Sequence, residues 1–331
     1  MKVFVTGGGG FLGFSIVQQL VERDYEVTTF SRGRYPALDR LNVTHVQGNL
    51  GRFEEVRDAM AGCEVVFHVA AKAGVWGSYD SYHQANVVGT ENVIRACRAN
   101  GIANLIFTSS PSVVYAGVDS VGGDERLPYP DRYDGFYPQT KALAERRIMA
   151  TSGAALRTVS LRPHLIWGPG DTHFLPRFFE RAKQGRLAVL GNRPNYVDCI
   201  YIDNAAQAHL QAMDTLLSNP QRVAGKTYFI SQGEPIAVET LINRLIATGG
   251  YPPVQRRLPV ALARSAGWLL ETVYRQFNIK REPPLTLFTA KQLSTSHHYD
   301  ISAAQRDFGY TPTVSMDEGM ARLTKWVQTR T

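Results

Sequence analysis

Short apolar segments alternate with amphipathic segments from residue 2 to residue 162. The apolar segments lack the polar alternation of a half-exposed sheet, which favours strands that are buried on both faces. Strands that alternate with helices predict an α/β fold, a doubly wound parallel sheet with helices on both faces. The expected strands are Lys2–Thr6, Glu26–Phe30, Val43–Gln47, Val65–Ala70, Leu105–Ser109 and Thr158–Arg162, and the strongest expected helices are Phe11–Arg23, Asn86–Asn100 and Tyr137–Ala150.

The alternation becomes irregular after Arg162, where a Pro- and Gly-rich stretch indicates an exit loop. Two later apolar segments, Asn195–Ile202 and Lys226–Ser231, are predicted to be strands that return to the main sheet. We therefore expect one domain over residues 1–165, with returning strands around residues 195–232. Residues 166–194 and 233–331 would form a smaller C-terminal lobe that binds substrate.

One segment of that lobe, Leu258–Ile279, has a helical apolar pattern interrupted by Arg264 and Arg275. It carries too much charge to span a bilayer. Three interpretations stay open: a core helix, a lid over a hydrophobic pocket, or a helix lying on a membrane or on partner enzymes of the same pathway.

The charge and the cysteine content of the chain argue against several classes of protein. The formal net charge is +7, but no Lys/Arg block with interleaved aromatic residues occurs, so nucleic-acid binding is not expected. Cys63, Cys97 and Cys199 are odd in number, widely spaced and without metal-ligand spacing. They favour a reducing, cytoplasmic location with no disulfide framework and no metal site. A strand that starts at Lys2 leaves no room for a signal peptide.

A glycine-rich turn directly follows the first strand and opens the first helix. Its spacing fits GxxGxxG through Gly7, Gly10 and Gly13, and it also fits GxGxxG if Gly8 replaces Gly7. In this strand–turn–helix context, glycines let backbone N–H groups approach a pyrophosphate, and the helix N-terminus favours its charge. We therefore predict a Rossmann-type dinucleotide site that also includes Phe11 and Leu12 of the helix start.

The end of the second strand indicates which dinucleotide binds. Ser31 stands where an acidic residue would hold a ribose 2′-hydroxyl, and Arg32 and Arg34 follow it. A hydroxyl with two guanidinium groups suits a 2′-phosphate, which favours NADPH/NADP⁺ with NADH still possible. Asn49 and Leu50, after the third strand, are candidate adenine contacts.

Tyr137 and Lys141 form a YxxxK motif at the start of a helix, which places both side chains on one helix face. A nearby ammonium favours the phenolate form of a tyrosine, whose pKa is ordinarily about 10. Ser110, with Ser112 as a fallback, follows another strand at the sheet edge where ligands bind in this class of fold.

These motifs resemble the extended short-chain dehydrogenase/reductase family over nearly the whole chain. The resemblance implies that Tyr137 transfers a proton, that Ser110 holds the substrate oxygen, and that Lys141 binds the nicotinamide ribose and lowers the Tyr137 pKa. It also implies cofactor contacts from Ala70, Ala71 and Pro163 and a homodimer formed through the helices Asn86–Asn100 and Tyr137–Ala150. The segments that carry the resemblance are TGGGGFLG (Thr6–Gly13), HVAA (His68–Ala71), NVVGTENV (Asn86–Val93), TSS (Thr108–Ser110), YPQTK (Tyr137–Lys141) and LRPHLIWGPGD (Leu161–Asp171).

Two branches of the family compete. The stretch AAKAGVWGSYDSYHQANVVGT (Ala70–Thr90) looks like the 2-alkyl-3-oxoalkanoate reductases of bacterial long-chain olefin biosynthesis, which use NADPH on a branched β-keto acid. The TSS-P-S-V-V pattern (Thr108–Val114) is shared with 3β-hydroxysteroid and decarboxylating sterol-4-carboxylate dehydrogenases. A nucleotide-sugar epimerase and a catalytically silent NAD(P)-binding protein are further alternatives.

The expected substrate is therefore a hydrophobic small-molecule acid. Its carboxylate needs a counter-charge, for which Lys72 is the candidate because it directly follows the HVAA segment. His68 is predicted to be a packed core histidine, and His297 and His298 are predicted at the surface. The full set of expected substrate contacts is Lys72, Trp76, Ser110, Ser112, His164 and Trp167.

Overall fold

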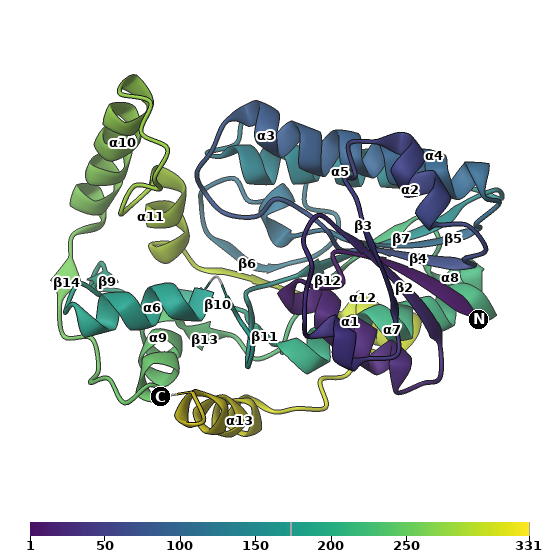
Figure 1. The fold of residues 1–331 in the computed structure, drawn as a ribbon. Helices are drawn as coiled ribbons and strands as arrows, with labels where there is room; N and C mark the ends of the chain where they lie inside the picture. Colours follow the sequence, from purple (N-terminus) through teal and green to yellow (C-terminus); the bar gives the residue numbers. More distant parts are fainter. Residues whose placement is uncertain (173, 331) are drawn as a thin grey trace.

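A seven-stranded sheet forms the centre of the computed structural model, which describes residues 1–172 and 174–330 (Figure 1). All its neighbouring strands pair in parallel, in the order β12-β7-β5-β4-β1-β2-β3. The strands are β1 (Lys2–Thr6), β2 (Glu26–Ser31), β3 (Thr44–Gln47), β4 (Val65–His68), β5 (Asn104–Thr108), β7 (Arg157–Pro163) and β12 (Lys226–Ile230).

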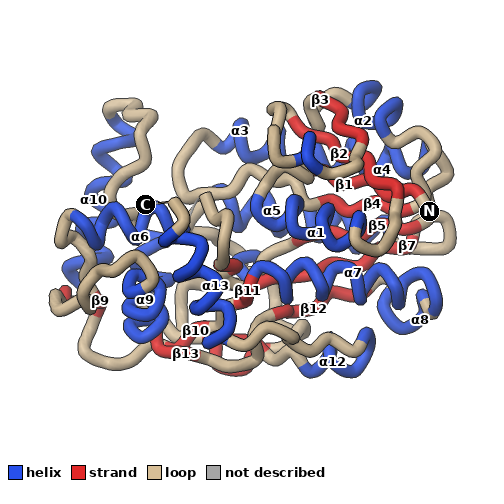
Figure 2. The backbone as a smooth tube through the Cα atoms, turned by 60° about the horizontal axis from the view of Figure 1, so that its bottom comes forward, coloured by secondary structure: helices blue, strands red, loops and turns tan. Residues whose placement is uncertain are grey.

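Helices cover both faces of this sheet (Figures 1 and 2). The helices α1 (Phe11–Val21) and α7 (Ile202–Ser218) pack together on one face. On the other face lie α2 (Phe53–Ala59), α4 (Gly89–Ala99) and α5 (Phe136–Thr151). A short helix α3 (Tyr79–His83) and a π-helical turn (Gln84–Val88) lead directly into α4, while two 3₁₀ turns lie at Leu38–Arg40 and Pro111–Val113.

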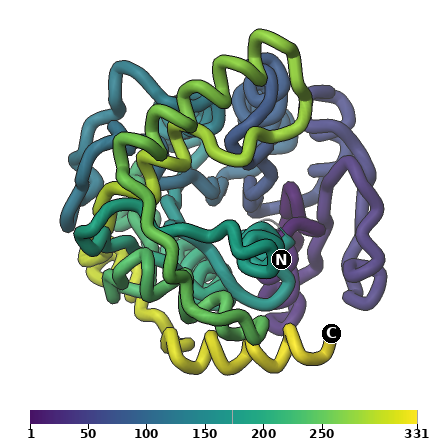
Figure 3. Tube along the Cα trace, turned by 90° about the vertical axis from the view of Figure 1, so that its left-hand side faces the viewer, coloured from purple at the N-terminus to yellow at the C-terminus, as the bar shows by residue number. Residues whose placement is uncertain are grey.

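The C-terminal lobe contains shorter elements, with α10 (Val260–Gln276) at its outer edge (Figures 1 and 3). A four-stranded sheet has the order β13-β10-β15-β6, and β8–β11 and β9–β14 form two further pairs. The remaining helices are α6 (Phe174–Lys183), α8 (Pro220–Val223), α9 (Val238–Ala247), α11 (Leu287–Leu293), α12 (Ser302–Phe308) and α13 (Met316–Gln328). The remaining strands are β6 (Ser120–Gly123), β8 (Ile166–Trp167), β9 (Val189–Leu190), β10 (Tyr196–Val197), β11 (Ile200–Tyr201), β13 (Ile236–Ala237), β14 (Arg257–Leu258) and β15 (His297–Tyr299).

The predicted fold class is confirmed, and the expected strands of the first 162 residues match the observed ones to within two residues at each end. Every residue of β4 and β5 is buried, as continuous apolar strands require. Lys226–Ser231 does return to the main sheet, as β12 beside β7. The prediction for Asn195–Ile202 is wrong: this segment splits into β10 and β11, which pair with β13, β15 and β8 instead.

The segment Leu258–Ile279 is mostly the helix α10, but it is not a core helix. Among its helical residues only Ala263 and Gly267 are buried, so most of its apolar side chains do not join the core. In the part of the chain that the structure describes, no helix is long and apolar enough to cross a membrane.

Candidate active site

The glycine-rich turn has the geometry of a backbone anion site. Gly7 has φ +71°, and a Cβ there would come within 3.0 Å of the Ala70 backbone. A Cβ on Gly13 would lie 2.1 Å from the Gly7 carbonyl oxygen, so this glycine lets α1 pack onto the turn. The first turn of α1 carries no acidic residue. These features fit the pyrophosphate of a dinucleotide and support the GxxGxxG reading.

A directional hydrogen-bond chain fixes the ends of β1 and β4 beside this turn. The Thr6 hydroxyl oxygen accepts hydrogen bonds from the Val69 and Ala70 amides, so its proton is donated to Nδ1 of His68 at 2.8 Å. His68 Nε2 then donates to Thr90 Oγ1 at 2.9 Å. Burial and the Lys141 charge lower the pKa of His68 to about 3, which keeps the ring neutral. The prediction of a packed core histidine is confirmed.

The two arginines after β2 are not equivalent. Arg34 reaches Asp39 at 3.2 Å, whereas Arg32 is exposed and makes no hydrogen bond or ion pair with any described residue. The backbone here is held by His45, whose Nε2 donates to the Gly33 carbonyl at 3.1 Å. Ser31 Oγ also bonds that carbonyl, at 3.2 Å. Arg32 is therefore better placed than Arg34 to meet a 2′-phosphate.

Three contacts near the predicted adenine site were not predicted from the sequence. A Cβ on Gly9 would lie 2.2 Å from the Tyr35 ring, so this ring covers the glycine turn. The Asn49 side chain accepts a hydrogen bond from the Gly51 amide at 2.9 Å, and therefore shapes its own turn. The Leu50 carbonyl accepts a hydrogen bond from Asn92 of α4. Asn49 can still offer its side-chain amide to a base, but its orientation is set by the turn.

Tyr137 and Ser110 come together as predicted, at the start of α5 and after β5. Burial raises the pKa of Tyr137, and a hydrogen bond with Ser110 partly counteracts this. Ser110 Oγ lies 2.9 Å from Ser112 Oγ and accepts the Ser112 amide at 3.2 Å. The two hydroxyls predicted as alternatives are therefore adjacent partners.

Lys141 is almost fully buried one helical turn after Tyr137. Its ammonium donates to the Thr108 carbonyl at 2.5 Å and lies 4.1 Å from the centre of the Phe107 ring. Burial lowers the pKa of Lys141 to about 7, although the Glu145 carboxylate opposes this. The expectation that Lys141 lowers the Tyr137 pKa is not met, because the pKa of Tyr137 is raised by burial while the ammonium is directed at Thr108.

A buried ion pair lies one further turn along α5. Glu145 contacts Arg162 of β7 at 2.6 Å, with both side chains at most 2% exposed. Tyr129 donates to the same carboxylate at 2.7 Å, and Ser160 donates at 2.9 Å. No local sequence pattern indicates this cluster, because its partners are brought together only by the packing of α5 on the sheet.

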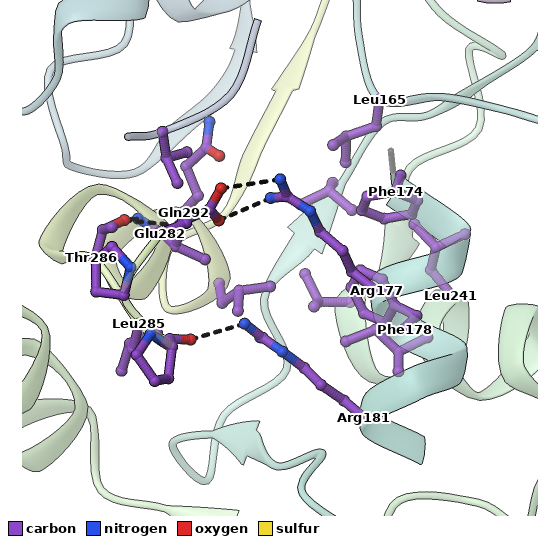
Figure 4. A pocket seen from close by; sticks show the side chains of 18 of the residues that line it. Leu165, Phe174, Arg177, Phe178, Arg181, Leu241, Glu282, Leu285, Thr286 and Gln292 are labelled. Atoms are coloured by element: carbon purple, nitrogen blue, oxygen red, sulfur yellow. Dashed lines mark hydrogen bonds and ion pairs between the residues drawn. The ribbon is translucent and has the colours of Figure 1, made fainter. Parts of the chain in front are cut away.

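Two cavities adjoin one another, and one of them is lined by the catalytic side chains. One of about 190 Å³ is lined by Ser110, Ser112 and Tyr137, with Gly74, Pro163, His164 and other residues. The second, of about 260 Å³, is mostly apolar and lies between α6, α9, α11 and the segment Glu282–Thr286. Figure 4 shows Arg177 and Arg181 of α6 reaching across it to that segment. Both cavities share the lining residues Val75, Leu165, Gln292 and His297.

The interpretation of Leu258–Ile279 as a lid over the hydrophobic pocket is wrong, because a different segment covers that pocket. No residue of that segment lines either cavity, and the cover is formed by the next segment, Glu282–Thr286, together with α11. Arg177 of α6 forms a two-bond ion pair with Glu282 of this cover, at 2.8 and 2.9 Å.

A pair of histidines contributes to the catalytic cavity. His297 was expected at the surface, but it is only 3% exposed and its Nε2 donates to the Gln292 carbonyl at 2.9 Å. Its Nδ1 therefore accepts from Nε2 of His164 at 3.2 Å. This leaves His164 Nδ1 as a buried acceptor without a partner among the described residues. Burial and the neighbouring histidines lower the pKa of His164 well below its usual value, so the ring is neutral.

Three residues that were predicted to contact the substrate line neither cavity. Trp167 is wrong as a substrate contact, because it is 1% exposed and packs on Tyr201 in the core. Trp76 donates to the Ile279 carbonyl at 3.0 Å and lines neither cavity. Lys72 also lies outside both linings, since its ammonium bonds Ser81 Oγ at 2.6 Å and lies over the Tyr82 ring.

An unpredicted asparagine positions the loop after β4. Asn86 Oδ1 accepts the Lys72 amide at 2.7 Å, and its Nδ2 donates to the Lys72 carbonyl and to Thr140 of α5. It lies in the π-helical turn before α4, which places it at the junction of α4, α5 and the loop. The only sequence signal was the NVVGT segment, in which this asparagine is the first residue.

Comparison with known proteins identifies the family of this chain. A model of the 3-beta hydroxysteroid dehydrogenase/isomerase family matches residues 4–260. The chain belongs to this family. A 2-alkyl-3-oxoalkanoate reductase of Shewanella oneidensis is 50% identical over 327 residues, which cover 97% of this chain and 84% of that protein. A second, from Stenotrophomonas maltophilia, is 49% identical over 326 residues, covering 98% of each.

Members of the sterol branch are more distant. The decarboxylating sterol-4-alpha-carboxylate 3-dehydrogenase of Mus musculus is 32% identical over 326 residues, covering 97% of this chain and 89% of that protein. Among solved structures, MoeE5 in complex with UDP-glucose and NAD has a TM-score of 0.77 at 22% identity, covering 100% and 99% of the two chains. At that identity the likeness shows the fold alone. The predicted extended short-chain dehydrogenase/reductase membership is confirmed, and the protein is an NAD(P)-dependent oxidoreductase acting on CH–OH and C=O groups.

Proposed function

We propose that this enzyme uses NADPH to reduce the 3-oxo group of a 2-alkyl-3-oxoalkanoate to the 2-alkyl-3-hydroxyalkanoate. The observation that carries the proposal is the near full-length similarity, at 49–50% identity, to two proteins named as reductases of that substrate. The apolar cavity beside the catalytic one supports it, since a long alkyl chain gains about 0.8 kcal/mol per buried CH₂.

The catalytic side chains suit the reducing direction. A bound NADPH would supply the hydride to the 3-carbonyl carbon. Because burial raises the pKa of Tyr137, this phenol stays protonated and is suited to donate its proton to the developing alkoxide. Ser110, held by the Ser112 amide, would donate a hydrogen bond to the same oxygen. Lys141 would bind the nicotinamide ribose.

The partner of the substrate carboxylate is part of the proposal. No lysine or arginine lines the catalytic cavity among the described residues, and Lys72 would have to leave Ser81 to reach it. The loop that carries Lys72 includes two lining residues, Gly74 and Val75, so a change of side-chain rotamer is the smallest movement required. If Lys72 binds the carboxylate, Lys72→Gln raises KM for the acid and leaves KM for NADP⁺ unchanged.

The deciding assay runs in the oxidative direction, because β-keto acids lose CO₂ spontaneously. Reduction of NADP⁺ is followed with a 2-alkyl-3-hydroxy acid, with its methyl ester and with a 3β-hydroxysteroid, and Tyr137→Phe gives the background. We expect turnover of the acid and little of the ester. Faster turnover of the steroid would assign the enzyme to the sterol branch, which the 32% identity to the Mus musculus enzyme makes the second candidate.

A further inference from the structure

The exposed apolar surface of this protein is concentrated on α10 and the residues that follow it. Ten large hydrophobic residues are exposed in the described chain, and six of them fall between residues 262 and 279. Phe277 is 73% exposed and Trp268 60%, values unusual for side chains of this size. The six residues are Leu262, Trp268, Leu269, Val273, Phe277 and Ile279.

The outward face of α10 carries almost no charge, while both of its ends are basic. The other exposed positions of the helix are Ala261, Ser265, Thr272, Arg275 and Gln276, so Arg275 is the one charged exposed residue on it. Arg256 precedes the helix, and Lys280 and Arg281 follow it, all three exposed; Arg257 is exposed as well but pairs with Glu239 at 2.7 Å. Between residues 256 and 281 the sole acidic residue is Glu271, whose carboxylate bonds Arg275 and the Leu287 amide.

We propose that this face of α10 binds an anionic lipid bilayer surface. An apolar helix face with an exposed tryptophan inserts at the boundary between headgroups and acyl chains. Basic residues at the two ends of that face add attraction to anionic headgroups. A second copy of this chain fits less well, because pairing two α10 helices in either direction brings basic ends together.

The helix is joined to the cover of the apolar cavity. A Cβ on Gly267 would lie 2.8–2.9 Å from the Thr286 and Leu287 backbones, so the two segments pack backbone to backbone. The Glu271 carboxylate accepts the Leu287 amide at 2.7 Å, and Arg264 donates to Ser294 at 3.0 Å. Figures 1 and 3 show α10 as the outermost element above α11. A bilayer bound to α10 would therefore lie beside the cavity cover, whatever substrate the enzyme takes.

Vesicle sedimentation tests the proposal on the full chain. We expect the protein to sediment with vesicles of phosphatidylcholine and phosphatidylglycerol at low salt, and much less with phosphatidylcholine alone. The double variant Trp268→Ser/Leu269→Ser should lose at least tenfold in vesicle affinity, and Lys280→Gln/Arg281→Gln should weaken the dependence on anionic lipid. Val118→Ser/Val121→Ser, at exposed apolar positions outside α10, is the matched control and should bind like the native protein.

Two further readouts separate lipid from protein partners. Trp268 fluorescence should shift to shorter wavelength with anionic vesicles, and Trp268→Phe should remove that shift while sedimentation is kept. Thermal unfolding checks that each variant is folded. Absence of binding to anionic vesicles, or equal binding by Trp268→Ser/Leu269→Ser, would overturn the proposal. A concentration-dependent dimer that the same double variant abolishes would overturn it too, and would assign the face to self-association.

Discussion

Replacing the buried catalytic lysine should make the cofactor-free protein more stable while it destroys turnover. Burial lowers the pKa of Lys141 from its ordinary 10.5 to about 7, so the unfolded chain holds the proton more tightly than the folded chain. Each pKa unit corresponds to about 1.36 kcal/mol, so burying the ammonium costs roughly 5 kcal/mol. Lys141→Met removes this cost but leaves the Thr108 carbonyl without its donor, a loss of about 1–2 kcal/mol. The net expected gain at pH 6 is about 3 kcal/mol.

The dependence on pH has a definite sign. Below pH 7 the lysine is charged in both states and the cost is complete. From pH 7 to 10.5 the unfolded state binds more protons, so native stability rises with pH and the advantage of Lys141→Met shrinks. Above 10.5 both states are neutral and the difference left is the lost hydrogen bond. The opposite trend would be seen for a lysine stabilised by a partner.

Urea unfolding of the cofactor-free native protein and of Lys141→Met, from pH 6 to pH 10, measures this difference. Lys325→Met, at an exposed position of α13, is the matched control and should show no pH-dependent gain. Turnover by Lys141→Met should be lost at every pH. If the variant is less stable than the native protein by a constant amount across the range, then the lysine is not buried as a costly charge, and the reasoning fails.

Three further variants test the other parts of the site. Tyr137→Phe should lower turnover by about 10²–10⁴-fold with NADPH affinity unchanged, and retention of most of the rate would exclude Tyr137 as the proton donor. Arg32→Ala should reduce catalytic efficiency with NADPH by roughly tenfold to a hundredfold and leave NADH unaffected, while Arg34→Ala, whose partner is Asp39, should change little. Arg162→Met should destabilise the protein by about 3–5 kcal/mol because Glu145 stays buried and unpaired. Arg322→Met, which breaks exposed pairs, should cost within about 1 kcal/mol in the same urea assay, and equal losses would contradict the burial argument.

The features that could be predicted from the sequence are those with local signals. Gly7, Gly10 and Gly13 follow an apolar strand, and Tyr137 and Lys141 lie one turn apart on a helix, so a short window of sequence is sufficient for each. The failures concern contacts between distant segments. Trp167 packs on Tyr201 and the His297 ring bonds His164, and neither pairing leaves a trace in the local pattern. The long helix α7, which covers one face of the sheet, was not singled out either.

The charge of the catalytic Lys141 depends on the buried ion pair between Glu145 and Arg162. Tyr137, Lys141 and Glu145 occupy successive turns of α5, so the proton donor, the ammonium and a carboxylate share one helix face. Burial would otherwise raise the pKa of Glu145, but the Arg162 guanidinium lowers it and keeps the carboxylate ionised. That negative charge in turn raises the pKa of Lys141 against the larger effect of burial. Without Glu145, less of the lysine would be charged at neutral pH. The YxxxK motif therefore does not determine the charge of its own lysine, because β7 supplies the arginine that keeps Glu145 ionised.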